Sequence, residues 1–249
     1  MHYPSVPSVE TRTKLSTLID LLRLRSFNEP TQTAYRFLAD APAGVTYAEL
    51  DLRARAIAAW LQSRRLQNER ALLLYPPGLD FIAAFFGCIY AGTIAVPSRL
   101  PQTKRDRLQT IANDSQAACV LSLGQDLTRI AREPWTTGLQ LLATDAVPMD
   151  EADDWREPSS NNRSLAYLQY TSGSTSTPKG VMVTHANVLE NSAYIQHGFE
   201  HGPESVSLSW LPHFHDMGLV DGIIQPLYSG FTGLLMSPAA LLQNPARWL

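Results

Sequence analysis

Apolar and polar positions along the chain predict strands and helices in turn. Short apolar runs predict strands at residues 71–75, 93–96, 118–123, 165–170, 181–184, 206–209 and 231–236. Apolar residues at helical spacing predict helices at residues 15–24, 50–61, 80–91, 103–115 and 186–196, and another that starts near residue 219. This alternation is typical of an α/β fold in which mostly parallel β-sheets are flanked by helices.

Local signals at the ends of these segments support the assignment. Thr46 and Glu49 have the spacing of a capping box, so a helix with an arginine-rich outer face should follow them. Gly92 stands where the helix at residues 80–91 should end. The longest apolar run, residues 81–96, is interrupted by two glycines and is short for a membrane span. We therefore expect a buried helix followed by a buried strand.

Residues 145–164 differ from the rest because they are acidic and polar and show little periodicity. We interpret them as a surface connector and not as a domain boundary, since the alternation resumes directly afterwards. The chain stops at residues 244–249, "NPARWL", without a polar tail. We expect residues 1–249 to be one large domain that is incomplete at its C-terminal end.

Composition narrows the classes of function. The 249 residues are 45% hydrophobic and 17% charged, which is an ordinary globular balance. The net charge of -3 argues against a nucleic-acid partner. The first 14 residues lack an apolar segment, so no signal peptide is expected. Cys88 and Cys119 both lie in apolar surroundings, which favours core residues in a reducing cytoplasm over a disulfide.

The most informative stretch is "LQYTSGSTSTPKGVMVTH", residues 168–185, where a hydroxyl-rich loop separates two predicted strands. Glycine lets a loop bring its amides close to an anion, and Ser and Thr hydroxyls add donors. Lys179 adds a charge that can reach phosphate oxygens. The loop is not a Walker A motif, because Pro178 precedes the lysine where that motif has glycine. A solvated Ser/Thr turn is the simpler alternative.

The ending Pro-Lys-Gly and the flanking strands decide between these interpretations. The stretch closely resembles the phosphate loop of the adenylate-forming enzymes, which include acyl-CoA synthetases, luciferases and peptide-synthetase adenylation domains. The form of that loop is [YT]-[ST]-S-G-[ST]-[ST]-G-x-P-K-G, and Ser176 departs from it by replacing glycine. If this position needs a positive φ, serine costs about 1 kcal/mol there. The departure bears on the strength of triphosphate binding.

A second stretch, residues 208–238, contains "WLPHFHDMGL", "QPLYSG" and "LMSP". Together with "AVPSRLP" at residues 95–101, it resembles the fatty acyl-AMP ligase branch of the same superfamily. That branch activates fatty acids with ATP and Mg2+ and passes the acyl group to an acyl carrier protein in polyketide or lipopeptide biosynthesis. The resemblance implies that His215 is catalytic, close to the acyl carboxylate and the α-phosphate.

The resemblance also implies a set of binding residues. Met217 and Gly218 should form the mouth of an acyl tunnel beside Asp216, Gly218 because a side chain would block it. Ile223 and Ile224 are candidates for the tunnel wall, although apolar helical spacing indicates core more often. Mg2+ should be held partly by Thr175. The residues implied at the phosphates are Thr171, Ser172, Gly173, Ser174, Thr175, Ser176, Thr177, Lys179 and Gly180.

Three alternatives remain at this stage. His213, His215 and Asp216 could hold a metal, but the H-x-H-x-D-H pattern needs another histidine after its aspartate, and Met217 and Gly218 follow Asp216 instead. The chain could instead belong to an acyl-CoA ligase, or be a non-catalytic acyl-binding or interaction module. Members of the superfamily are about twice as long, and their adenine-binding motif, hinge and C-terminal lysine have no counterpart in these residues. The resemblance thus implies that residues 1–249 are the large N-terminal domain and that the C-terminal lid domain is absent.

Overall fold

The structure is a computed structural model, and it describes residues 15–39, 43–101, 106–171 and 178–248. The chain divides into two compact units. Unit 1 comprises Met1–Asp51, Ser160–Ser164 and Thr184–Leu249, and unit 2 comprises Leu52–Ser159 and Leu165–Val183. The helix α3 (Tyr47–Ser63) begins in unit 1 and continues into unit 2.

Unit 2 is built on a six-stranded sheet in the order β6-β5-β3-β4-β7-β8. Its strands are β3 (Arg70–Tyr75), β4 (Ile94–Arg99), β5 (Cys119–Ser122), β6 (Gln140–Ala143), β7 (Leu165–Thr171) and β8 (Lys179–Thr184). The first five strands in this order pair in parallel. From β3 to β6, strands that follow one another in sequence are joined through helices, as a parallel sheet requires.

Helices cover both faces of this sheet. Successive residues of β3 point to opposite faces, so each face presents apolar side chains to a helix. Leu72 and Leu74 contribute to an apolar cluster with α5 (Asp106–Ser115) and Ile130 of α6 (Gly124–Ile130). On the other face, Tyr75 makes an edge-on ring contact with Phe81 of α4 (Leu79–Ala91). Every residue of α4 from Phe81 to Ala91 is buried, which explains why this part of the helix carries no charged residue.

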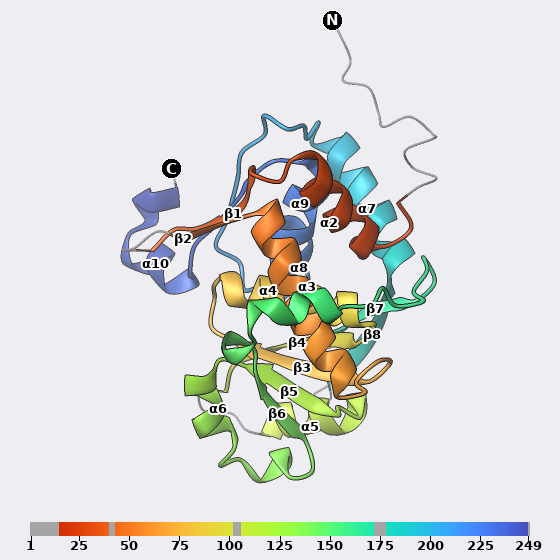
Figure 1. The fold of residues 1–249 in the computed structure, drawn as a ribbon. Helices are drawn as coiled ribbons and strands as arrows, with labels where there is room; N and C mark the ends of the chain where they lie inside the picture. The colour runs from red at the N-terminus through yellow and green to blue at the C-terminus, as the bar shows by residue number, and fades with distance from the viewer. Residues whose placement is uncertain (1–14, 40–42, 102–105, 172–177, 249) are drawn as a thin grey trace, which may run out of the picture. The chain divides into compact units, whose positions relative to one another are not determined.

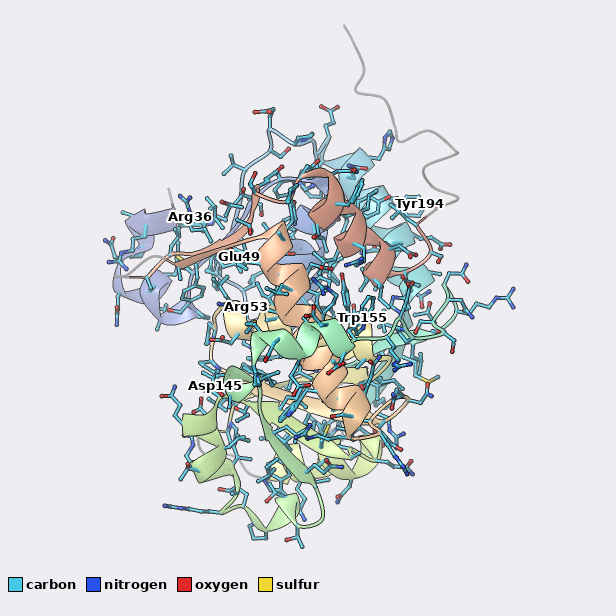
Figure 2. The ribbon with its side chains drawn as sticks, in the orientation of Figure 1. Arg36, Glu49, Arg53, Asp145, Trp155 and Tyr194 are labelled. Atoms are coloured by element: carbon cyan, nitrogen blue, oxygen red, sulfur yellow. The ribbon has the colours of Figure 1, made fainter. Side chains whose placement is uncertain are left out.

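The segment between β6 and β7 is ordered and packs onto the helices of unit 2. A 3-10 helix, Met149–Asp154, lies across α3 (Figure 1), where the Arg55 guanidinium donates to the carbonyl oxygen of Ala152 at 3.3 Å. Trp155, labelled in Figure 2, donates from Nε1 to the carbonyl oxygen of Tyr90 at 2.9 Å. Residues 149–155 of the predicted connector therefore pack on α3 and α4.

Unit 1 contains a four-stranded sheet in the order β2-β1-β10-β9. These strands are β1 (Thr33–Phe37), β2 (Ala43–Thr46), β9 (Ser207–Ser209) and β10 (Gly233–Leu235). The β1 strand pairs antiparallel with β2 and parallel with β10. The main helices of the unit are α2 (Leu18–Asn28), α7 (His185–Gly198) and a helical run from α8 (Asp216–Leu219) through a π-helical turn (Val220–Ile224) to α9 (Gln225–Ser229); α10 (Pro238–Gln243) follows β10.

Long-range hydrogen bonds hold these elements of unit 1 together. The buried Tyr35 hydroxyl donates to the carbonyl oxygen of Ile223 at 2.6 Å, which joins β1 to the π-helical turn. Arg25 of α2 donates to the last carbonyl oxygens of α9, those of Leu227 at 3.0 Å and Tyr228 at 2.8 Å. A guanidinium at a helix C-terminus satisfies carbonyl groups that lack partners within the helix.

The predicted elements are largely confirmed, with differences at their ends. The capping box is present, since the Thr46 amide donates to Glu49 Oε2 at 2.8 Å. Gly92 ends α4 with a left-handed φ of 71°. The helix expected from residue 219 begins earlier, at Asp216. The strands β1, β2 and β6 and the helix α6 were not predicted. Within the described residues, no helix has both the length and the apolar character needed to cross a bilayer.

Candidate active site

The predicted phosphate loop connects β7 and β8, which are neighbours in the sheet of unit 2. Thr171, the last residue of β7, and Lys179, the first residue of β8, are both exposed. Gly180 follows in β8. The predicted residues Ser172, Gly173, Ser174, Thr175, Ser176 and Thr177 lie outside the described residues.

Tyr170, which fills the first position of the motif, meets Asp114, which lies outside the motif, where β7 ends. The hydroxyl of Tyr170 donates to Asp114 Oδ2 at 2.5 Å. Burial, together with the Asp114 carboxylate, raises the pKa of Tyr170, so the phenol stays protonated and remains a donor. Asp114 comes from α5, 56 residues away, and nothing in the sequence marks this pair as partners.

The predicted His215 segment lies in unit 1, after β9 and at the start of α8. His215 is the N-terminal cap residue of α8, and its carbonyl oxygen accepts a hydrogen bond from the amide of Leu219 at 2.9 Å. The side chain is 62% exposed, and its Nδ1 lies 2.5 Å from Asp216 Oδ1. That carboxylate oxygen also accepts from the Met217 amide at 2.8 Å. Asp216 therefore orients the imidazole through its Nδ1 atom.

Met217 and Gly218 differ in what surrounds them. Met217 is 58% exposed, whereas Gly218 is buried. A Cβ at position 218 would overlap the carbonyl oxygen of Pro212, so the backbone of α8 lies directly against the preceding loop. The structure thus gives a packing reason for glycine here. The tunnel mouth remains a prediction, as does the tunnel wall at Ile223 and Ile224, which are both buried.

His213 and His215 differ in how much of each side chain is exposed to solvent. His213 is only 7% exposed, and desolvation lowers its pKa to about 4, so it is a neutral core residue at neutral pH. Across the described part of the chain, no group of three or more His, Cys, Asp and Glu residues could hold a metal ion. The alternative of a metal site formed with His213, His215 and Asp216 has no support in this geometry.

Comparison with known proteins assigns the chain to a family. The family described as "AMP-binding enzyme" matches residues 24–249. The chain belongs to this family. It is 45% identical to the medium-chain-fatty-acid–[acyl-carrier-protein] ligase JamA of Moorena producens, over 96% of the chain and 43% of JamA. It is 36% identical to the long-chain-fatty-acid–AMP ligase FadD32 of Mycolicibacterium smegmatis, over 87% of the chain and 36% of FadD32.

Solved structures confirm the fold of this family member. A fatty acid AMP ligase from Legionella pneumophila superposes with a TM-score of 0.92 at 38% identity, over 97% of the chain and 43% of that structure. A Legionella pneumophila fatty acyl-adenylate ligase in complex with acyl adenylate and pyrophosphate gives a TM-score of 0.91, over 96% of the chain and 43% of that structure. The chain spans less than half the length of these relatives and corresponds to their N-terminal portion.

Proposed function

We propose that the whole protein containing this chain activates a fatty acid with ATP and passes the acyl group to an acyl carrier protein. The observation that carries the proposal is the 45% identity to JamA, which extends over 96% of the chain. The predicted phosphate loop and the His215 segment supply the corresponding chemistry. The Legionella relative that was solved with acyl adenylate and pyrophosphate supports the same reaction.

The first step is nucleophilic substitution at the α-phosphorus of ATP. A carboxylate oxygen of the fatty acid forms the new P–O bond, and the bond between the α-phosphorus and the bridging oxygen breaks to release pyrophosphate. Catalysis of such a step depends mainly on positioning and charge stabilisation. Lys179 and the loop would hold the β- and γ-phosphates, and His215 would contact the carboxylate and the α-phosphate. Transfer of the acyl group to the carrier's thiol then releases AMP.

Mg2+ would accompany ATP and neutralise charge on its phosphates. Magnesium sites of this kind use one or two protein oxygens together with phosphate oxygens and waters, so they need no dedicated cluster of side chains. The proposed protein ligand is Thr175, which lies outside the described residues. Cys88 and Cys119 are free and buried, which supports our assignment of the protein to the cytoplasm. A role in polyketide or lipopeptide biosynthesis belongs to the same proposal.

The proposal is tested by ATP–pyrophosphate exchange with fatty acids of different chain lengths, using the whole protein. Because a charge-assisted contact contributes roughly 1.5–3 kcal/mol, Lys179→Ala should lower kcat/KM for ATP about tenfold or more. Arg132→Ala is a matched control, because it removes an exposed cation from the turn after α6. Unchanged kinetics in Lys179→Ala would exclude this side chain from the nucleotide site.

The acceptor and the non-catalytic alternative need separate measurements. Supplying either holo acyl carrier protein or coenzyme A to the preformed adenylate separates an acyl-AMP ligase from an acyl-CoA ligase. Titration calorimetry with a non-hydrolysable acyl-adenylate analogue tests whether the whole protein binds the intermediate of the proposed reaction. A protein that serves only as an interaction module should show no saturable binding of this analogue.

A further inference from the structure

Tyr170 lies where the predicted phosphate loop leaves the sheet, one residue before the end of β7. Its residue surface is only 8% exposed, and its ring belongs to the apolar cluster formed with Leu72, Leu74 and α5. The hydroxyl is held by Asp114 Oδ2 at 2.5 Å. The ring is therefore fixed at both ends, by apolar packing along its body and by a charge-assisted hydrogen bond at its tip.

Gly180 places the other end of the loop against the same ring. A Cβ at this position would lie 2.9 Å from Cζ, 3.0 Å from the hydroxyl oxygen and 3.2 Å from Cε2 of Tyr170. No left-handed φ is recorded at Gly180, so the glycine is needed for space and not for an unusual backbone conformation. The backbone of β8 thus lies directly over the phenol, one residue after Lys179.

We propose that Tyr170 is a positioning residue for the phosphate loop, and that Asp114 acts through it. The inference rests on the proposed function, because it assigns the loop to ATP. The Tyr170 ring sets the distance between the strand that enters the loop and the strand that leaves it. Phosphate-binding loops act through donors that are held in place before the ligand arrives, so the positions of the two ends matter. The contact at Gly180 also sets the backbone of the neighbouring Lys179.

A core role alone would explain the ring but not the hydroxyl. Phenylalanine at position 170 would fill the same volume in the cluster and would leave Asp114 without its donor. If Tyr170 only fills the core, Tyr170→Phe should behave like any loss of one hydrogen bond in unit 2. If it positions the loop, the same change should act selectively on ATP.

The test compares Tyr170→Phe and Asp114→Asn with Tyr75→Phe in the whole protein. Tyr75 is a matched control, because its buried hydroxyl lies 2.7 Å from Thr144 Oγ1 and its ring packs on Phe81, on the opposite face of the sheet from Tyr170. Losing one hydrogen bond corresponds to about a twofold to tenfold change, which we expect in KM for ATP for the two loop variants, with KM for the fatty acid unchanged. Tyr75→Phe should leave both KM values unchanged at a similar loss of thermal stability.

Two further measurements distinguish a positioning role of Tyr170 from a purely structural one. The double variant Tyr170→Phe/Asp114→Asn should match Tyr170→Phe, since phenylalanine already removes the donor of the one contact that asparagine weakens by removing the charge of the acceptor. Hydrogen exchange of residues 171–180 needs no substrate, and it should be faster in Tyr170→Phe and unchanged in Tyr75→Phe. Equal effects of all three single variants on both substrates, or unchanged exchange in Tyr170→Phe, would overturn the proposal. If the wild type shows no ATP-dependent activity, the proposed function fails, and hydrogen exchange still decides whether Tyr170 positions the loop.

Discussion

At the scale of the residue, His185 is a buried imidazole that acts as a hydrogen-bond acceptor. It is 2% exposed, and its Nδ1 accepts from the Leu18 amide at 3.2 Å, at the first turn of α2. Burial lowers its pKa to about 4, although the nearby Asp20 raises it slightly. Because the unfolded histidine has a pKa near 6.5, the unfolded state binds the proton first. The stabilisation is therefore complete above pH 6.5 and is lost as the pH falls towards 4.

We expect His185→Asn to weaken this pH dependence, because Asn offers an acceptor that does not titrate in this range. Because of this difference in pKa, the unfolding free energy of the wild type should fall by about 2 kcal/mol through His185 alone when the pH is lowered from 7 to 5. Urea unfolding at both pH values measures the difference between the variant and the wild type. His197→Asn, at an exposed position near the end of α7, is the control and should keep the wild-type slope. Identical slopes for wild type and His185→Asn would contradict the assignment.

At the scale of the element, the start of α8 depends on close backbone packing at Gly218. A Cβ there would overlap the Pro212 carbonyl oxygen, so Gly218→Ala must shift α8 and, with it, His215 at its cap. Overpacking of this kind costs about 1–3 kcal/mol of unfolding free energy. Gly198→Ala is the matched control, because nothing lies within 4 Å of a Cβ at the end of α7. Thermal unfolding should show a loss for Gly218→Ala and none for Gly198→Ala.

Elements with local signals were predicted from the sequence, and elements defined by distant partners were not. The capping box at Thr46 and the C-cap at Gly92 are read from a few neighbouring residues, and both are present. The strand β1 pairs with β10, about 200 residues away, and its five residues carry little pattern of their own. Trp155 stands in an acidic stretch that resembles a surface connector, yet its indole reaches Tyr90.

The same distinction holds for the candidate site. The two sequence motifs identified Lys179 and His215, and the structure shows that both side chains are exposed. The support beneath the loop could not be predicted, because the Tyr170–Asp114 pair joins residues 56 positions apart and only the packing of α5 on the sheet brings them together. The packing role of Gly218 was also missed, since it depends on the path of the loop at Pro212.

At the scale of the whole molecule, we expect residues 1–249 alone to show no fatty-acid-dependent pyrophosphate exchange. The chain spans 43% of JamA, and the family's adenine-binding motif and C-terminal lysine have no counterpart in its sequence. ATP would be held through its phosphates only, so any binding should be weak and should fall as salt is added. Removing one electrostatic stabiliser of a transition state already costs about 10²–10³ in kcat.

The measurement compares residues 1–249 with the whole protein in the same exchange assay, with medium- and long-chain fatty acids. Far-ultraviolet circular dichroism on residues 1–249 confirms that they are folded, so that inactivity is not mistaken for loss of structure. The whole protein with Lys179→Ala marks the activity that remains when one phosphate contact is removed. Residues 1–249 should fall below that level, because they lack several contacts at once. Exchange at a rate near that of the whole protein would show that these residues contain the complete catalytic set, and the roles assigned here to Lys179 and His215 would then need to be reassigned.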